Sequence, residues 1–262
     1  NTSEIGINEN PVSLFVDDVR LAQAGVTLPP GSSKNITLEG QIDKGGVHTG
    51  YFELPGDLIP VDNKRFFTFR IPELLNVLIV GSKQETEFID VALHAGTGSY
   101  FRTKRISYKD LSREYLTDID VVVLDRMISL PSSFEGRLDR FVNEGGGLLI
   151  LGVDDEYMND KTVSDFLSRL TGVRPEMTVG KPNSETYIEF GKPDYNHPAF
   201  SIFRKEGIPP VRFYQVMQIS DRRGQILSFS NGLPAIVDAV NGEGRIIFTT
   251  FNLNYESSDI LT

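Results

Sequence analysis

The stretch Phe141-Val142-Asn143-Glu144-Gly145-Gly146-Gly147-Leu148-Leu149-Ile150-Leu151-Gly152 decides the fold. It opens on the last turn of a helical pattern in which Phe134, Leu138 and Phe141 recur at helical spacing. Three glycines that can end a helix follow, and then a run of four apolar residues. An apolar run directly after a helix is typical of a strand in a parallel sheet that helices cover on both faces.

The same alternation precedes this stretch. The runs Val77-Leu78-Ile79-Val80 and Val121-Val122-Val123-Leu124 predict two further buried strands, and Phe101 to Ile106 predicts another. A helix is expected at Gln84 to His94, where four apolar residues recur at three- and four-residue spacing. These four are Phe88, Val91, Ala92 and Ala95. A short helix is expected near Tyr108 to Tyr115, and Ser132 or Ser133 is expected to cap the helix before Gly145.

The fold class predicted from this alternation is α/β, with a doubly wound, mostly parallel sheet and a flavodoxin-like core. Beyond a helix at Thr162 to Leu170 the alternation stops, and the remaining strands read as an antiparallel extension. Within it, Val237 to Phe248 predicts a hairpin, because Asn241-Gly242 suits a type I′ turn.

The first 71 residues show a different sequence pattern from the rest of the chain. Short alternating segments lie at 12–16, 34–38, 47–54 and 65–70, separated by segments rich in Pro, Gly, Asn and Asp. This pattern predicts a partial immunoglobulin-like, antiparallel β-sandwich over residues 1–71. Pro72 stops the last of these strands, so we place the boundary there and assign 72–262 to the α/β domain.

Length and composition agree with two domains. The chain has 262 residues, and a domain typically takes roughly 150. The net charge is −10 with scattered basic residues, which argues against a nucleic-acid-binding surface. No apolar run approaches the roughly 20 residues that span a bilayer, and the first residues do not resemble a signal peptide. Cysteine is absent, which excludes disulfides and any cysteine nucleophile.

Candidate ligand residues follow the predicted parallel strands, because ligands of such sheets bind at the carboxyl ends of the strands. They are Ser82, Asp125, Asp154 and Asp155. Converging carboxylates could hold Mg²⁺ or Ca²⁺. The alternative is that these acids accept backbone N–H groups in turns and helix caps. The sequence contains no Walker, His-Glu-x-x-His or Gly-x-Ser-x-Gly motif.

Histidine is scarce, and we expect structural roles for all of it. Only His48, His94 and His197 occur. A catalytic histidine must lie within reach of a nucleophile, and nothing in the sequence pairs one of these with a serine.

The order of elements resembles a known family. Phe141 to Gly152 is similar to the passage that leads to the nucleophile turn of class I glutamine-amidotransferase-like domains. Residues 50–69 leading into Asn76 to Val80 resemble the junction between a β module and such a domain in aerotolerance-type (BatA-like) bacterial membrane proteins. Asn196 to Phe200 and Gly242 to Phe248 are also similar to that family.

The resemblance implies a fold without its catalysis. Class I amidotransferases carry a cysteine on the turn that here reads Gly152-Val153-Asp154-Asp155-Glu156. Without cysteine no thioester can form, so glutaminase activity is excluded. Members of the resembled family are longer proteins with transmembrane helices. This implies an extracytoplasmic (periplasmic), non-catalytic interaction or scaffolding region with envelope or membrane protein partners, which reaches the membrane only through segments outside this chain.

We expect no cofactor for this region. Two alternatives remain open. The first is a metal-assisted hydrolase that uses Asp125, Asp154 and Asp155. The second is a module that binds a carbohydrate or another small polar ligand in a crevice lined by Ser82, Asp125 and Asp154.

Overall fold

The computed structural model describes residues 4–42, 44–54, 63–71, 74–95, 100–157 and 159–260. The chain forms two compact units, Asn1–Leu74 and Leu75–Thr262. The boundary expected at Pro72 falls on a residue outside the described ranges. Each unit has its own sheet, and each is described by itself below.

The first unit contains one four-stranded antiparallel sheet, with the strand order β2-β1-β3-β4. Its strands are β1 (Ile7–Val16), β2 (Val19–Leu28), β3 (Gly46–Glu53) and β4 (Lys64–Ile71). The predicted β-sandwich is therefore wrong for the described residues, because a sandwich needs two packed sheets. The strand predicted at 34–38 is absent there, whereas β2, whose apolar alternation is interrupted by small residues, was missed.

Cross-strand side-chain pairs stabilise this sheet. The rings of Phe15 on β1 and Tyr51 on β3 stack with their centroids 4.8 Å apart. Phe66 on β4 continues the row, 5.3 Å from Tyr51. The ammonium group of Lys64 lies 4.6 Å from the centre of the Tyr51 ring. Aromatic neighbours of this kind contribute beyond the area that they bury.

A buried histidine ties the turn after β1 to the start of β3. Nδ1 of His48 lies 2.6 Å from Oδ2 of Asp17, and Nε2 lies 2.9 Å from the carbonyl oxygen of Lys44. Both ring nitrogens therefore face acceptors, an arrangement that the doubly protonated ring satisfies. The hydrogen bond to Asp17 raises the pKa of His48, and the same bond lowers the pKa of Asp17.

The second unit is built around a nine-stranded sheet in the order β11-β10-β13-β14-β15-β8-β7-β5-β6. Its strands are β5 (Leu75–Val80), β6 (Phe101–Ile106), β7 (Val121–Met127), β8 (Gly147–Val153), β10 (Ile188–Pro193), β11 (Arg212–Phe213), β13 (Gln225–Phe229), β14 (Pro234–Asn241) and β15 (Gly244–Thr249). The strands β9 (Pro175–Gly180) and β12 (Gln215–Ile219) form a separate pair. The helices are α1 (Glu85–His94), α2 (Ser132–Asn143), α3 (Lys161–Thr171) and α4 (Pro198–Ser201), with short 3₁₀ turns at Tyr108–Arg113, Asp155–Tyr157 and Ile202–Arg204.

The prediction of a mostly parallel, doubly wound sheet is wrong, because this sheet is mixed. From β6 to β15 its four neighbouring pairs are parallel, and from β15 to β11 its four pairs are antiparallel. Strands account for 42% of the described residues and helices for 20%, which is too strand-rich for alternating β and α units throughout. The reason is that β10, β11, β13 and β14, all after α3, join the same sheet in antiparallel pairs.

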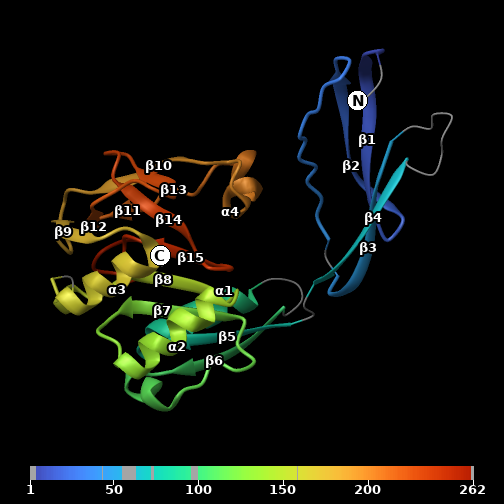
Figure 1. Cartoon of the computed structure of the whole chain (residues 1–262). Helices are drawn as coiled ribbons and strands as arrows, with labels where there is room; N and C mark the ends of the chain where they lie inside the picture. The colour runs from blue at the N-terminus through green and yellow to red at the C-terminus, as the bar shows by residue number, and fades with distance from the viewer. Residues whose placement is uncertain are drawn as a thin grey trace. The chain divides into compact units, whose positions relative to one another are not determined.

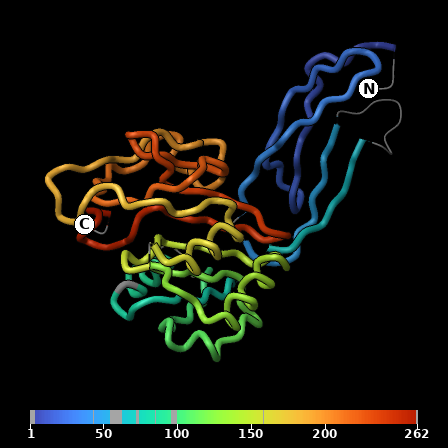
Figure 2. Tube along the Cα trace, turned by 60° about the vertical axis from the view of Figure 1, so that its left-hand side comes forward, coloured from blue at the N-terminus to red at the C-terminus, as the bar shows by residue number. Residues whose placement is uncertain are grey.

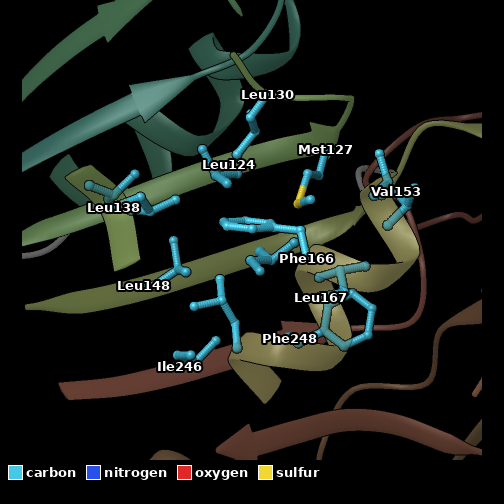
Figure 3. Close-up of a cluster of buried hydrophobic side chains, with 14 of the residues drawn as sticks. Leu124, Met127, Leu130, Leu138, Leu148, Val153, Phe166, Leu167, Ile246 and Phe248 are labelled. Carbon is cyan, nitrogen blue, oxygen red and sulfur yellow. The ribbon is translucent and has the colours of Figure 1, made fainter. Parts of the chain in front are cut away.

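The largest core lies between one face of this sheet and the helices α2 and α3. Phe134 and Leu138 of α2 are fully buried, as are Ile246 and Phe248 of β15. Figure 3 shows side chains from β7, β8, α2, α3 and β15 meeting in this layer. The three apolar runs that predicted buried strands form the adjacent strands β5, β7 and β8 of this sheet and are largely buried, so those predictions are confirmed.

Helix α1 covers part of the opposite face. It lies where the sequence predicted a helix, but the apolar residues that indicated it are exposed. Ile89 and Leu93 pack on the sheet instead. Ile89 is 8% exposed, whereas Phe88 and Val91 are 43% and 62% exposed. The helix therefore has apolar residues on two sides.

Two local expectations are corrected by backbone geometry. Pro131, rather than Ser132 or Ser133, is the N-cap residue of α2, and no side chain caps this helix. In the hairpin between β14 and β15, Asn241 pairs with Gly244, and Gly242 has a φ of 61°. A positive φ at the first loop residue alone is the pattern of a type II′ turn, not of type I′.

The contact between His48 and Asp17 predicts a pH window for the stability of the first unit. The raised pKa of His48 means that its contribution is present in full below the ordinary value of 6.5 and is lost as the pH rises through the raised value. The lowered pKa of Asp17 means that its contribution is present above 3.8 and is lost as the pH falls through the lowered value. Hydrogen-exchange protection of β3 should therefore be highest between these limits.

An NMR titration of the histidine ring protons checks this directly, since only three histidines must be resolved. The variant His48→Gln should lose the decline of protection on the alkaline side. A His48 pKa at or below 6.5 would contradict the assignment.

Candidate functional site

The carboxyl ends of β5, β7 and β8 form the edge at which the sequence placed a site. Ser82 is exposed on the turn after β5, and its carbonyl oxygen accepts bonds from the backbone N–H and the hydroxyl of Thr86 at 3.1 and 2.8 Å. Ser82 therefore belongs to the turn that begins α1. The three predicted acids lie at or beyond the ends of β7 and β8.

Asp125 is enclosed by the protein. Its residue is 1% exposed, and its side chain lies against the backbone of Gly81, where an added Cβ would also meet the methyl group of Thr86. The hydroxyl of Tyr108 donates to its carbonyl oxygen at 2.9 Å. Asp125 is thus beneath the turn before α1 and does not face solvent.

Asp154 is held by a cation and by its own turn. Its Oδ2 accepts from Nη2 of Arg126 at 2.6 Å, and its Oδ1 accepts from the backbone N–H of Glu156 at 3.0 Å. Arg126 has a φ of 45°, a conformation that is uncommon for a residue with a side chain. Charge-assisted bonds of this kind are strong and directional, so Asp154 is fixed toward Arg126.

Asp155 faces a different neighbour. Its Oδ1 accepts from Nε2 of Gln215 on β12 at 3.3 Å. Burial raises the pKa of this carboxyl group; the charge of Arg126 opposes the rise, and the charges of Asp154 and Glu256 add to it. The structure therefore does not bring Asp125, Asp154 and Asp155 to one point. Within the described ranges, no group of three or more His, Asp or Glu side chains could hold a metal ion.

The turn that carries the nucleophile in class I amidotransferases is filled here. Gly152 has a φ of 73°, and an added Cβ would clash with Oδ1 of Asn252 and with the carbonyl oxygen of Phe251. Nδ2 of the buried Asn252 donates to the carbonyl oxygen of Val153 at 3.2 Å. The side chain of Val153 is itself part of the large core.

The space left beside this turn is small. A cavity lined by Val153, Asp155, Gln215 and Asn252, among others, has a volume of about 10 Å³, which suffices for about one water molecule. No local sequence pattern indicates Asn252, since 99 residues separate it from Val153. Gln215 was missed for the same reason, whereas Arg126 follows a predicted strand directly and was expected at this edge.

The remaining two histidines also hydrogen-bond to groups of their own unit. His94, at the end of α1, lies 2.8 Å from the carbonyl oxygen of Asp90. Nδ1 of His197 accepts from the backbone N–H of Ala199 at the start of α4, and its Nε2 lies 3.0 Å from Asp238. Within the described part of the chain, the three histidines thus hydrogen-bond to carboxylate and backbone groups.

Two larger cavities lie on the β5–β6 side of the sheet. One, of about 380 Å³, is at the carboxyl ends and is lined by Gly81, Lys83, Thr86, Arg105, Ile106, Ser107 and Asp110. The other, of about 500 Å³, is at the amino ends, where Asn76 and Asp118 are among its lining residues. Ligands of open α/β sheets bind at the carboxyl ends, so the cavity beside Lys83 is the better ligand candidate despite its smaller volume.

Among the described residues, no helix is long and apolar enough to cross a membrane. No protein-family model matches the sequence, and no curated protein matches it.

Solved structures show the fold. A cytoplasmic protein from Salmonella typhimurium LT2 is 14% identical with a TM-score of 0.53, and the match covers 69% of this chain and 89% of that chain. A putative ThuA-like protein from Bacteroides uniformis ATCC 8492 is also 14% identical with a TM-score of 0.53, and covers 72% of this chain and 86% of that one. The ThuA-like fold is a class I glutamine-amidotransferase-like fold. The second unit therefore has an amidotransferase-like fold.

A β-galactosidase from Bacillus circulans sp. alkalophilus is similar at a TM-score of 0.47 and 14% identity, over 70% of this chain and 29% of that chain. This likeness is too low to bear on activity. The resemblance to aerotolerance-type membrane proteins is not tested by these matches and stays a prediction.

The packing of Asn252 on Gly152 predicts coupled effects on stability. Gly152→Ala should destabilise the protein by more than about 1 kcal/mol, because alanine is strained at this φ and its Cβ meets the Asn252 amide. Asn252→Ala should cost about 1–3 kcal/mol, because it leaves a buried carbonyl oxygen without its donor. The double variant should cost less than the sum, since one clash is then relieved. Urea unfolding measures all three, and strictly additive costs would show that the two residues do not interact.

Proposed function

We propose that this chain is a non-catalytic interaction or scaffolding region of a membrane-anchored bacterial protein. The observation that carries the proposal is the filled turn at the end of β8, where Asn252 occupies the space above Gly152. The extracytoplasmic location and the envelope partners rest on the resemblance to aerotolerance-type proteins.

The chemistry of the turn supports this reading. A nucleophile at this position must project into an open pocket beside a base. Here Val153 projects into the core, and Asp154 is paired with Arg126. A space of about 10 Å³ beside the turn is far smaller than the roughly 300 Å³ of a small ligand pocket.

The decisive experiment measures turnover and complex formation on one preparation. The purified chain, with Mg²⁺, Mn²⁺ or Zn²⁺ added, should hydrolyse esters, amides, phosphoesters and glycosides no faster than the Asp154→Asn variant does. This variant removes the acid that a metal-assisted hydrolase would use. The same preparation should form a stoichiometric complex with an envelope protein. The proposal would be contradicted if the chain hydrolysed one of these substrates, lost that activity in Asp154→Asn, and formed no complex with an envelope protein.

A second candidate function is the binding of a small anion in the cavity of about 380 Å³. Lys83 and Arg105 place two cationic side chains on its wall, and Ser107 adds a hydroxyl group. Arg105 is only loosely paired, since its Nε lies 3.7 Å from Asp90. This cavity lies at the edge where the sequence predicted a ligand site. Its wall is formed by the loops after β5 and β6. The sequence analysis placed a candidate ligand residue in the loop after β5 but none in the loop after β6.

This candidate predicts thermal stabilisation by inorganic phosphate or a small carboxylate, because a ligand that binds only the folded state raises its stability. Lys83→Gln should reduce the effect, and Asp110→Asn should increase it by removing a negative charge from the wall. Lys109→Gln is the matched control, since Lys109 is exposed and does not line the cavity. Equal stabilisation of all four proteins would place the anion elsewhere.

A further inference from the structure

Helix α1 presents an apolar surface to solvent. Phe88, Val91, Ala92 and Ala95 are all exposed, and we call them the α1 stripe. Their spacing of three and four residues places them on one side of the helix. Helix α1 lies against β5 and β6 (Figure 1). Ile89 and Leu93 pack on the sheet from the other side of the helix, so the stripe is not required for the attachment of α1 to its own unit.

An aromatic residue from the other end of the chain extends this surface. The ring of Tyr255 meets the ring of Phe88 edge to face, with the centroids 5.9 Å apart. Tyr255 is 55% exposed, and Val91 is 62% exposed. Exposed apolar side chains that lie next to one another are typical of interaction surfaces.

We propose that the α1 stripe binds a second copy of this chain, with the two α1 helices antiparallel across a two-fold axis. The order of side-chain sizes along the stripe supports this occupant. An axis between Val91 and Ala92 sets Phe88 against the partner's Ala95 and Val91 against the partner's Ala92. Each large side chain then meets a small one, which lets the helices approach closely. A parallel pair would set Phe88 against the partner's Phe88 and leave the alanines facing each other.

The polar residues beside the stripe are compatible with the antiparallel order. Glu87 lies in the first turn of α1, and His94 lies in its last turn. Antiparallel pairing brings the acidic end of each helix toward the imidazole-bearing end of the other, and it sets the helix dipoles in opposite directions. The stripe itself carries no charged side chain.

The interaction should be weak and strengthened by salt. A pair of ten-residue helices buries less than the roughly 1,200 Å² of a standard interface. Two chains that each carry a charge of −10 also repel each other at low ionic strength. Self-association does not depend on the proposed scaffolding role, because a dimer could form whether or not the unit binds an envelope partner.

Disulfide trapping tests the geometry, because the chain has no cysteine of its own. In the antiparallel pair, residue 92 lies about 1.5 Å along the axis from its counterpart, and residue 95 lies about 10.5 Å from its counterpart. A disulfide needs Cα atoms within about 7 Å. With a mild oxidant, Ala92→Cys should therefore give a covalent dimer, and Ala95→Cys alone should not.

The control is Val240→Cys, which places a thiol on another exposed apolar position, 72% exposed on β14. It should give no more dimer than Ala95→Cys. Equal trapping of all three variants, or no trapping of Ala92→Cys, would overturn the proposal. Trapping of Ala95→Cys as fast as Ala92→Cys would refute the antiparallel order.

Sedimentation of the unmodified chain over a range of concentrations provides a measurement without a crosslink. The weight-average mass should rise with concentration and should rise further when salt is added. Val91→Glu should keep the chain monomeric at every concentration, whereas Val240→Glu should leave the association unchanged. A monomer at all concentrations in the unmodified chain, or an equal effect of both variants, would contradict an α1 interface.

Discussion

The second unit depends on the pairing of β15 with two different neighbours. Ile246 and Phe248 pair in parallel with Leu148 and Ile150 of β8, while the other edge of β15 pairs antiparallel with β14. In Figure 2 the red trace of β15 lies between the green and the orange parts of the chain. Without this strand, the parallel and antiparallel halves would be separate sheets with two additional open edges. Gly244 permits the pairing, because a Cβ there would meet the carbonyl oxygen of Val142.

Strand β15 also determines which residues lie at the carboxyl end of β8. β15 ends at Thr249, and three residues later Asn252 reaches the turn after β8, since the two strands are parallel neighbours. The glycine at position 152 and the amide of Asn252 then occupy the region where an amidotransferase needs an open nucleophile turn. The small volume left beside this turn is therefore a consequence of how the sheet is completed.

The parts that could be predicted from sequence are those with a local physical signal. The runs at Val77 and Val121 are buried because four consecutive apolar residues have no exposed face in a strand. Periodicity located α1, but it could not say which of two apolar sides meets the sheet, and the side that does so carries Ile89 and Leu93. The acids at 154 and 155 were placed at the correct edge, yet their partners Arg126 and Gln215 come from other elements. Such partners follow from tertiary packing, which no local pattern encodes.

The position of the exposed apolar residues bears on where recognition takes place in this molecule. A monomer gains no burial energy from Phe88 or Val91 while they face water, and a polar residue at either position would serve α1 equally well. The carboxyl edge shows the opposite arrangement, because Asp154 is paired with Arg126, Asn252 donates to Val153, and the space beside β8 is closed. The exposed apolar side chains of α1 are thus accessible from solvent, while the space beside the end of β8 is about 10 Å³.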